Sequence, residues 1–443
     1  MTIIRRAHLK AVRRGDQREG TVMRTNWAGN YTYRATELRH AASVAEVQEI
    51  VRSAQVIRVL GTRHSFNDIA DTDGVHLSLE PMNQVLAIDP VARRVTVEGG
   101  IRYGDLAPVL HAQGWALANL ASLPHISVAG AVATATHGSG SGTGNLATSV
   151  AAMDFVTASG DIRTISRDMD ADMAAGAVVS LGALGAVVRL TLAIEPTYQV
   201  RQSVFTGLSH DVLADQFDAI FAAGSSVSVL TDWRGDRAHA VWVKDRVAGS
   251  GATIAPRTDF FGALAADRKM HPLPGADAED CTAQMGVAGP WHERLPHFRM
   301  GFTPSHGAEI QAEFFMPREA AAMAVTAMRG LGDRMAQVLM VSEVRTVAAD
   351  NLWLSPGQRG PYVAVHFTFR RDWDAVRAVL PAIEAELGRL GAVPHWGKVT
   401  TMAPATIAAR IPRLADFRAL VMASDPMGKF RNDFVNRMVF GGP

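Results

Sequence analysis

Polar side chains that could do acid–base chemistry alternate along two predicted strands in the second half of the chain. Within residues 362–370, His366 and Thr368 share the face opposite the large apolar side chains. Glu343 and Arg345 stand two residues apart in the other strand and therefore also share a face. Two such faces on one sheet would form a polar floor suited to a ligand with several hydroxyl groups. The alternative is a solvated ion pair on an exposed sheet face.

Two glycine-bearing loops in the first half could bind a phosphate-containing ligand. Residues 58–67 and 124–140 combine small residues, hydroxyls and exposed backbone N–H groups, which favour anion binding. The alternative is a pair of tight turns in an α/β core. The glycine cluster 138–144 follows no predicted strand and has no suitably placed acidic residue after it, which argues against a Rossmann site. His292 and His297 miss the two-histidine zinc spacing by one residue, and no metal site is expected.

Composition narrows the class of protein. The 443 residues are 48% hydrophobic and 20% charged, which is typical of a folded globular chain. A formal charge of +1 gives no overall field for nucleic acid or an anionic membrane, so neither is expected as a partner. The single cysteine, Cys281, excludes an intramolecular disulfide and fits a reducing cytoplasm best. The longest apolar stretch, 177–188, is too short to span a membrane.

The elements of the first half alternate between helix and strand signals. A capping box at 43–46 predicts a helix start, and a second helix is predicted over 103–113. Residues 94–98 and 186–194 have the pattern of strands. Residues 153–165 read as a hairpin with a glycine-containing loop.

The pattern changes after Pro196. Longer alternating strands follow, including residues 339–346 and 362–370, and a helix is predicted from about 372 to 391. This order favours an antiparallel sheet with helices on one side, and so an α+β second domain.

Four separated motifs, in the expected order, resemble the vanillyl-alcohol-oxidase-type flavoproteins, with the PCMH-type FAD-binding fold. The resemblance is greatest to the alditol oxidases, and the sugar-lactone oxidases are related. It covers residues 26–434. The motifs are Gly61-Thr-Arg-His-Ser65, Ala121-Ser-Leu-Pro-His125, Gly130-Ala-Val-Ala-Thr134 with Thr136-His-Gly-Ser-Gly140, and His395-Trp-Gly-Lys398.

The resemblance implies an α+β fold of two domains. A PCMH-type FAD-binding domain would span residues 25–200, and an antiparallel-sheet substrate-binding domain would span 201–402. Residues 403–443 would return to the FAD domain. Residues 1–24 carry seven Lys or Arg side chains and are expected to form a mobile basic extension.

The resemblance also implies FAD, attached covalently through His64. Where the family has a small, glycine-type residue before this histidine, this chain has Arg63. Gly182 and Gly185 would flank the adenine half. The other residues expected to contact the cofactor are Val59, Leu60, Gly61, Thr62, Arg63, Ser65, Ser122, Ser127, Gly130, Ala131, Val132, Ala133, His137, Gly138 and Val187.

The implied reaction is hydride transfer from the terminal carbinol carbon of a sugar alcohol, such as xylitol or sorbitol, to flavin N5. Oxygen would reoxidise the flavin and give hydrogen peroxide. Arg345 and Lys398 would stabilise oxyanion character at the reacting hydroxyl, and His366 or neutral Lys398 would accept its proton. Glu343 would bind further hydroxyls and hold Arg345 in place. The expected catalytic residues are Arg345, Lys398, Ser122 and His366, and the expected substrate-binding residues are Ser122, Glu343, Arg345, Thr368 and Lys398.

Three other functions compete with this interpretation. Within the family, the alternative is an aldonolactone oxidase or dehydrogenase acting on a sugar ring. Outside it, the chain could be a nucleotide-binding regulatory protein with an inactive redox site, or a nucleic-acid adaptor acting through its basic N-terminus. The preferred interpretation needs a polyol and O2, and no obligate protein partner is evident.

Overall fold

A five-stranded antiparallel sheet organises the first half of the chain. The structure is a computed structural model that describes residues 24–247, 257–301 and 308–442. The predicted hairpin is confirmed, because β7 and β8 pair directly and antiparallel. In order across the sheet, the strands are β4 (Val85–Asp89), β5 (Arg94–Glu98), β9 (Ala186–Ala193), β7 (Val150–Val156) and β8 (Ile162–Ser166).

A smaller parallel sheet leads into the first glycine loop. Helix α1 (Val44–Ser53) begins as the capping box predicts, because Ser43 Oγ accepts a hydrogen bond from the Glu46 N–H. Strand β2 then runs directly into Gly61. The strands are β1 (Glu37–His40), β3 (Val75–Ser78) and β2 (Ile57–Val59), with β3 in the centre.

A ten-stranded antiparallel sheet organises the second half. Strand β19 (Tyr362–Arg370) has the predicted bounds, and β18 (Leu339–Val347) extends one residue beyond its predicted end. The expected α+β architecture is therefore confirmed. The other strands are β11 (Gln199–Thr206), β12 (Ser226–Thr231), β13 (Ala240–Val247), β14 (Asp259–Phe260), β15 (Ala263–Ala265), β16 (Gly289–Pro290), β17 (Glu309–Pro317) and β20 (Val393–Pro394).

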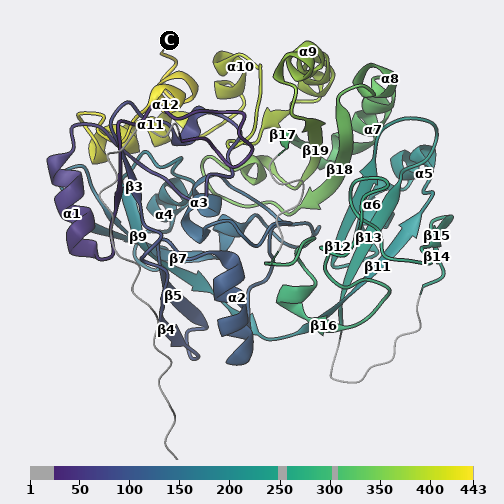
Figure 1. Ribbon diagram of the computed structural model, residues 1–443, viewed down its shortest axis with the longest axis horizontal. Helices are drawn as coiled ribbons and strands as arrows, with labels where there is room; N and C mark the ends of the chain where they lie inside the picture. The colour runs from purple at the N-terminus through teal and green to yellow at the C-terminus, as the bar shows by residue number, and fades with distance from the viewer. Residues whose placement is uncertain (1–23, 248–256, 302–307, 443) are drawn as a thin grey trace, which may run out of the picture.

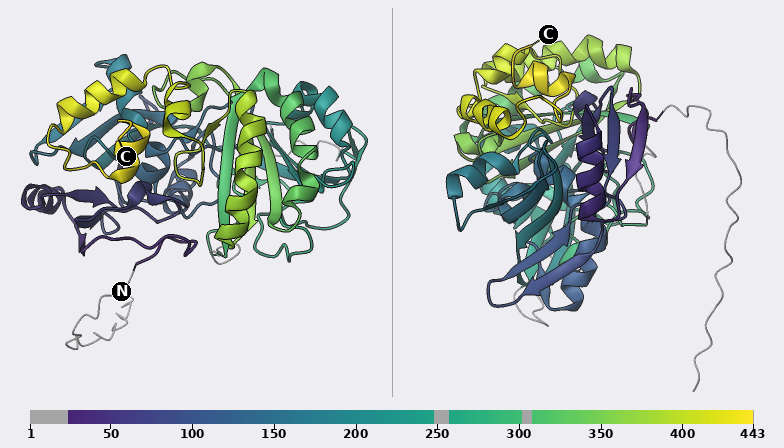
Figure 2. Two further views of the ribbon diagram at one scale, coloured as in Figure 1. Left: turned by 90° about the horizontal axis from the view of Figure 1, so that it is seen from above. Right: turned by 90° about the vertical axis from the view of Figure 1, so that its left-hand side faces the viewer.

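Helices cover one face of this large sheet. Helix α9 (Trp373–Arg389) runs along this face of the sheet (Figure 2). It buries Val376, Leu380 and Ile383, at helical spacing, in the core against the sheet. The apolar side chains of β19, Phe367 among them, belong to the same core. Because side chains alternate along a strand, His366 and Thr368 point to the opposite face. The other helices of this layer are α5 (His210–Asp215), α6 (Phe217–Ala222), α7 (Ala321–Arg329) and α8 (Gly332–Met335).

The last part of the chain returns to the first half. Arg58 Nη1 donates to the Phe430 carbonyl oxygen at 2.8 Å, and Asn432 Nδ2 donates to the Asp71 carbonyl oxygen at 2.8 Å. Figure 1 shows the C-terminal helices beside the N-terminal elements. The remaining helices are α2 (Tyr103–Ala112), α3 (Val128–Ala133), α4 (Ala171–Val178), α10 (Pro404–Ala408), α11 (Leu414–Ser424) and α12 (Asp433–Met438).

The boundaries expected at residues 24, 200 and 402 stay predictions. Most of the expected basic extension, residues 1–23, lies outside the described residues. Within the described ranges, no helix is both long and apolar enough to cross a membrane.

Candidate active site

One cavity lies between the first half of the chain and the polar face of the large sheet. Its wall contains the first glycine loop on one side and β17, β18 and β19 on the other. The sequence interpretation requires these regions to meet, and the structure brings them together. The candidate residues in this wall are His64, Ser122, Glu343, Arg345, His366, Thr368 and Lys398.

Strand register builds the polar floor of the cavity. Glu343 on β18 lies opposite His366 on β19, and His366 lies opposite Glu313 on β17. Residues paired in this way point to the same side of a sheet with their side chains in contact range. The two predicted polar faces therefore meet, and a third strand adds a carboxylate between the cations.

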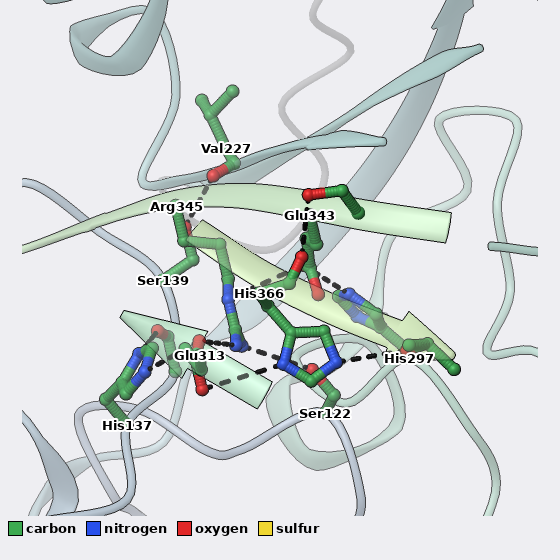
Figure 3. A network of polar contacts seen from close by, with 12 residues as sticks. Ser122, His137, Ser139, Val227, His297, Glu313, Glu343, Arg345 and His366 are labelled. Carbon is green, nitrogen blue, oxygen red and sulfur yellow. Dashed lines mark hydrogen bonds and ion pairs between the residues drawn. The ribbon is translucent and has the colours of Figure 1, made fainter. Parts of the chain in front are cut away.

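Glu313 is the centre of the floor and is only 1% exposed. Its Oε2 accepts a hydrogen bond from Lys398 Nζ at 2.6 Å, and its Oε1 accepts one from Arg345 Nη2 at 2.7 Å. His137 Nε2 approaches Oε1 at 3.2 Å, and His366 Nδ1 lies 3.6 Å from Oε2 (Figure 3). One buried carboxylate thus holds two cations and contacts two imidazole rings.

The charges of this cluster depend on one another. Desolvation opposes ionisation of Glu313, yet the Lys398 ammonium, followed by His137, holds the pKa of its carboxyl well below the usual range. Burial lowers the pKa of Lys398, and Glu313 opposes that shift. Burial also disfavours the charge of Arg345, but Glu343 and Glu313 outweigh it and raise its pKa.

His366 and Lys398 form a close pair beside Glu313. Lys398 Nζ lies 2.7 Å from His366 Nδ1, and His366 Nε2 lies 3.1 Å from Thr368 Oγ1. Desolvation, followed by the Lys398 charge, lowers the pKa of His366 to about 4, so its imidazole is neutral near pH 7. A charged Lys398 has only donors, so His366 Nδ1 accepts and its Nε2 carries the hydrogen.

Arg345 has two carboxylate partners, the expected Glu343 and, at a shorter distance, Glu313. Glu343 Oε1 is 3.7 Å from Arg345 Nε, whereas Glu313 Oε1 is 2.7 Å from Arg345 Nη2. The closest partner of Glu343 is His297, whose Nε2 lies 2.9 Å from Oε1. Arg345 Nη1 also donates to Ser122 Oγ at 3.4 Å. The second partner follows from the pairing of β17 beside β19, which places Glu313 within reach of Arg345.

The first glycine loop presents His64 to the cavity. The His64 ring stacks on Trp27 with centroids 5.1 Å apart, and its Nδ1 lies 3.1 Å from Thr62 Oγ1. Among the described residues, its buried Nε2 has no hydrogen-bond partner. Desolvation, followed by repulsion from His125, lowers the pKa of His64 to about 4, so the ring is neutral and keeps a free lone pair.

Arg63 occupies the position where the family has a small residue. Its φ of 64° lies in the left-handed region, which glycine adopts without strain and arginine does not. The Arg63 side chain extends to the segment that precedes β1, where its Nη1 donates to the Thr25 carbonyl oxygen at 3.3 Å. The loop therefore keeps a glycine-like backbone although it carries a bulky cation.

The walls of the cavity fit FAD. A Cβ on Gly61 or Gly130 would approach Ser127 Oγ to 2.9 or 2.8 Å, so a side chain at either position would displace Ser127 and crowd this wall. Gly182, expected beside the adenine half, also lies in the wall. The other predicted cofactor residues that line the cavity are Val59, Thr62, Arg63, Ser65, Ser122, Ser127, Ala131, Ala133 and His137.

Five predicted cofactor residues do not line this cavity. The side chains of Leu60 and Val132 are buried, and Gly138 packs against the Leu120 carbonyl oxygen. The Val187 carbonyl oxygen instead covers Gly99. The remaining predicted member of this region, Gly185, is also outside the wall.

The second glycine loop is fastened to the large sheet. Ser139 Oγ donates to the Val227 carbonyl oxygen at 2.5 Å (Figure 3). The Gly140 N–H donates to the Thr346 carbonyl oxygen at 2.8 Å. These bonds place His137 against Glu313. The loop therefore contributes to the polar floor as well as to the predicted cofactor wall.

Three residues of the site were not selected from the sequence as part of the polyol site, although His297 was considered as a metal ligand. Glu313 had a detectable signal, because Glu309, Gln311 and Glu313 alternate with apolar residues in the same way as the two recognised strands. His297 lies in a loop without periodicity. Lys244 ends a run of apolar strand residues and has no sequence signal of its own.

Comparison with known proteins agrees with this geometry. Residues 37–166 match the FAD binding domain family, and residues 307–438 match the D-arabinono-1,4-lactone oxidase family. The crystal structure of cholesterol oxidase from B. sterolicum shares the fold, with a TM-score of 0.72 at 13% identity over 94% of this chain and 96% of that one. Fold and site together define an FAD-dependent oxidoreductase of the PCMH type.

Sequence relatives define the family more narrowly. The alditol oxidase of Streptomyces sp. is 48% identical over 94% of this chain and 99% of its own. L-gulono-1,4-lactone dehydrogenase of Mycobacterium tuberculosis is 28% identical over 94% of this chain and 98% of its own. The chain belongs to the alditol oxidase family, to which the sugar-lactone oxidoreductases are more distant relatives.

Glu313→Gln tests whether one carboxylate stabilises the cluster. Removing it leaves buried Lys398 without its main counter-charge and Arg345 with Glu343 alone, so we expect a loss of about 3–5 kcal/mol in the free energy of unfolding at neutral pH. Because the pKa of Glu313 is lower in the folded protein, its stabilisation is present above the unfolded pKa and is lost as the pH falls through the folded value. Denaturant unfolding should therefore show a smaller difference at about pH 4 than at about pH 7.

The matched control is Glu49→Gln, which removes an exposed carboxylate. It should change the free energy of unfolding by less than about 0.5 kcal/mol. Equal effects of the two substitutions, or a Glu313→Gln effect that does not depend on pH, would contradict the role of Glu313.

Proposed function

We propose that this enzyme oxidises the terminal primary hydroxyl of a sugar alcohol, such as xylitol or sorbitol, to the aldose, with O2 as the electron acceptor and hydrogen peroxide as the second product. The observation that carries this proposal is the polar floor, where Glu343, His366 and Lys398 share one cavity with His64. The 48% identity to an alditol oxidase supports the same substrate class.

FAD, when bound, supplies an acceptor for the hydride of a carbinol carbon and passes the electrons to oxygen. The chain must then orient the carbinol and remove its hydroxyl proton. Ser122 Oγ would hydrogen-bond the reacting hydroxyl, since it already lies beside the Arg345 guanidinium. Arg345 is a fixed cation, and Lys398 is a second one once it carries the proton; both would stabilise oxyanion character on that oxygen.

The hydroxyl proton would be taken up by the Lys398–His366 pair while Lys398 is neutral, which makes Lys398 the ammonium that then faces the oxyanion. Lys398 Nζ and His366 Nδ1 lie 2.7 Å apart, so a proton taken by either atom is shared with the other. The lowered pKa of Lys398 brings its neutral form closer to working pH. Glu313 then balances the positive charge that remains on the pair.

The other hydroxyl groups of the polyol would form hydrogen bonds with the remaining polar side chains of the floor. Glu343 supplies an acceptor and Thr368 a hydroxyl that can donate or accept. A site with fixed donors and acceptors discriminates strongly against a ligand that leaves them unpaired. This is the reason to expect an open-chain polyol in preference to a lactone ring, which offers fewer hydroxyls.

The proposed location is the reducing cytoplasm, since the chain has one cysteine and it is buried. The proposed partners are small molecules, a polyol and O2.

Substrate comparison tests the proposed reaction directly. With air as the oxidant, xylitol or sorbitol should yield equimolar hydrogen peroxide, and kcat/KM for the better polyol should exceed that for L-gulono-1,4-lactone by at least about tenfold. Faster turnover of the lactone would replace the proposal with the lactone oxidase alternative. Flavin that no alcohol reduces would contradict both.

We also propose that FAD is attached covalently through His64, supported by the neutral ring and the unpartnered Nε2. Acid precipitation of wild-type protein should therefore leave the yellow colour in the pellet. His64→Ala should release it into the supernatant, while the exposed His40→Ala control behaves as wild type. Colour in the supernatant of wild-type protein would contradict covalent attachment.

Lys398→Met should slow the chemical step without releasing FAD. The substitution keeps much of the side-chain volume but removes the cation at the reacting hydroxyl, so we expect the rate of flavin bleaching by xylitol in anaerobic stopped flow to fall by about 10²–10³-fold. The exposed Lys269→Met control loses the same charge and should bleach at the wild-type rate. Equal rates for Lys398→Met and wild type would remove Lys398 from the mechanism.

A further inference from the structure

A second buried lysine lies behind the polar floor. Lys244, on β13, is only 1% exposed. Its Nζ donates to the Leu295 carbonyl oxygen and lies 3.2 Å from His297 Nδ1. Its Nζ also lies 3.5 Å from the Pro296 carbonyl oxygen and 6.0 Å from the centre of the Trp242 ring, and among the described residues no carboxylate forms an ion pair with it. This cation is therefore held by two carbonyl groups and one imidazole nitrogen.

The contacts of Lys244 fix the tautomer of His297. A charged lysine has three donors and no acceptor, so the imidazole nitrogen that faces it must accept. Nδ1 of neutral His297 is then unprotonated, and Nε2 carries the ring hydrogen. That hydrogen points to Glu343 Oε1, 2.9 Å from Nε2. Nε2 of His297 can therefore donate to Glu343 because the Lys244 ammonium faces the other ring nitrogen, Nδ1.

The His297 ring has little freedom to do anything else. Its backbone N–H donates to the Ser122 carbonyl oxygen at 3.0 Å, and its ring packs 4.7 Å from Trp242. Burial, partly opposed by Glu343, lowers the pKa of His297 to about 4 and keeps the ring neutral. Ser122 and Glu343, on either side of the polyol site, are therefore both attached to this residue.

Two lysine–histidine pairs with the same arrangement support the polar floor. Lys398 faces Nδ1 of His366, which directs its Nε2 to Thr368. Lys244 faces Nδ1 of His297, which directs its Nε2 to Glu343. The Lys398–His366 pair lies in the cavity wall, whereas Lys244 is not part of the wall and acts only through the imidazole of His297.

We propose that Lys244 is a positioning residue for the polyol: its ammonium fixes His297 in the tautomer that donates to Glu343, and this bond holds the Glu343 carboxylate with its second oxygen directed to the substrate hydroxyls. This inference rests on the proposed polyol oxidation. Without the ammonium, His297 can adopt either tautomer and no longer holds the Glu343 carboxylate in place. Substrate binding is therefore weakened more than the chemical step.

A double-mutant cycle on the FAD-loaded enzyme tests whether Lys244 acts through His297. Lys244→Met should raise the KM for xylitol about tenfold, the effect of one charge-assisted hydrogen bond, and change kcat by less than about twofold. His297→Gln replaces the imidazole with an amide that can donate to Glu343 without a tautomer. Adding Lys244→Met to His297→Gln should therefore change KM by less than about twofold.

Lys269→Met is the matched control, because it removes an exposed lysine charge and should leave KM and kcat at wild-type values. An unchanged KM in Lys244→Met would overturn the proposal. So would an equal rise in KM when Lys244→Met is added to wild type and to His297→Gln, because Lys244 would then act independently of the ring.

A pH profile supplies a second readout that does not need Lys244→Met to fold. Burial lowers the pKa of Lys244 to about 7, and neutral Nζ can accept a hydrogen from Nδ1. The charged groups that act on Lys244 and His297 are Glu343 and Arg345 of β18, with the Cys281 thiol near Lys244. Protonated Lys244 favours binding, so the KM of wild type relative to His297→Gln should rise from about pH 6 to about pH 8.5.

A constant ratio of the two KM values across that range would contradict the proposal. Wild-type turnover of xylitol separates the two levels of inference. Without that turnover the proposed function fails and the role of Lys244 fails with it. With turnover but no coupling between Lys244 and His297, only the role of Lys244 is lost.

Discussion

The ionised carboxylate of Glu313 is the interaction on which the site depends. Two cations, Arg345 and Lys398, face one cavity, and each would repel the other in a medium with little water to screen them. A carboxylate within hydrogen-bond distance of both lets them stay charged and fixed in place. An arrangement of this kind is what a reaction that develops negative charge on a hydroxyl oxygen needs, because the cations are in position before the reaction begins.

The large sheet makes this arrangement possible by separating two environments. Its helix-covered face holds the apolar side chains of β19, while the opposite face carries His366 and Thr368. Antiparallel pairing then places Glu343, His366 and Glu313 in one row across three strands. A slip of one residue in either pairing would turn that row into the apolar core, so the core and the site enforce the same register.

The first half of the chain supplies the other wall. Its glycines leave room for FAD, and its second loop is fastened to the sheet by Ser139 and Gly140. The C-terminal segment closes on the same half through Asn432 and Phe430. The two walls of the cavity are therefore tied together by hydrogen bonds from segments far apart in the sequence.

Local sequence patterns predicted the parts of this site that local physics determines. Alternation in β18 and β19 placed Glu343 with Arg345 and His366 with Thr368 on one face each, because the period of a strand decides which side chains share a face. The family resemblance selected these residues as substrate contacts. The same pattern in β17 was not enough to select Glu313, because its role depends on the pairing of β17 beside β19. The alternation of residues within one strand does not predict which strands pair.

His297 and Lys244 are harder still to predict. The first belongs to an irregular loop, and the second becomes significant only when that loop folds over its ammonium. Arg345 illustrates the same limit, because its neighbour in sequence, Glu343, suggested one ion pair and the fold provides a shorter one with Glu313. Spacing along the sequence does not predict contacts between residues that only the tertiary structure brings together.

A crystal structure of the reduced, FAD-loaded enzyme with xylitol would test the central claim most directly. We expect the terminal hydroxyl oxygen within hydrogen-bond distance of Ser122 Oγ and Lys398 Nζ, with the following hydroxyls at Glu343 and Thr368. A polyol bound elsewhere in the cavity, or with its terminal hydroxyl directed away from both cations, would contradict the account.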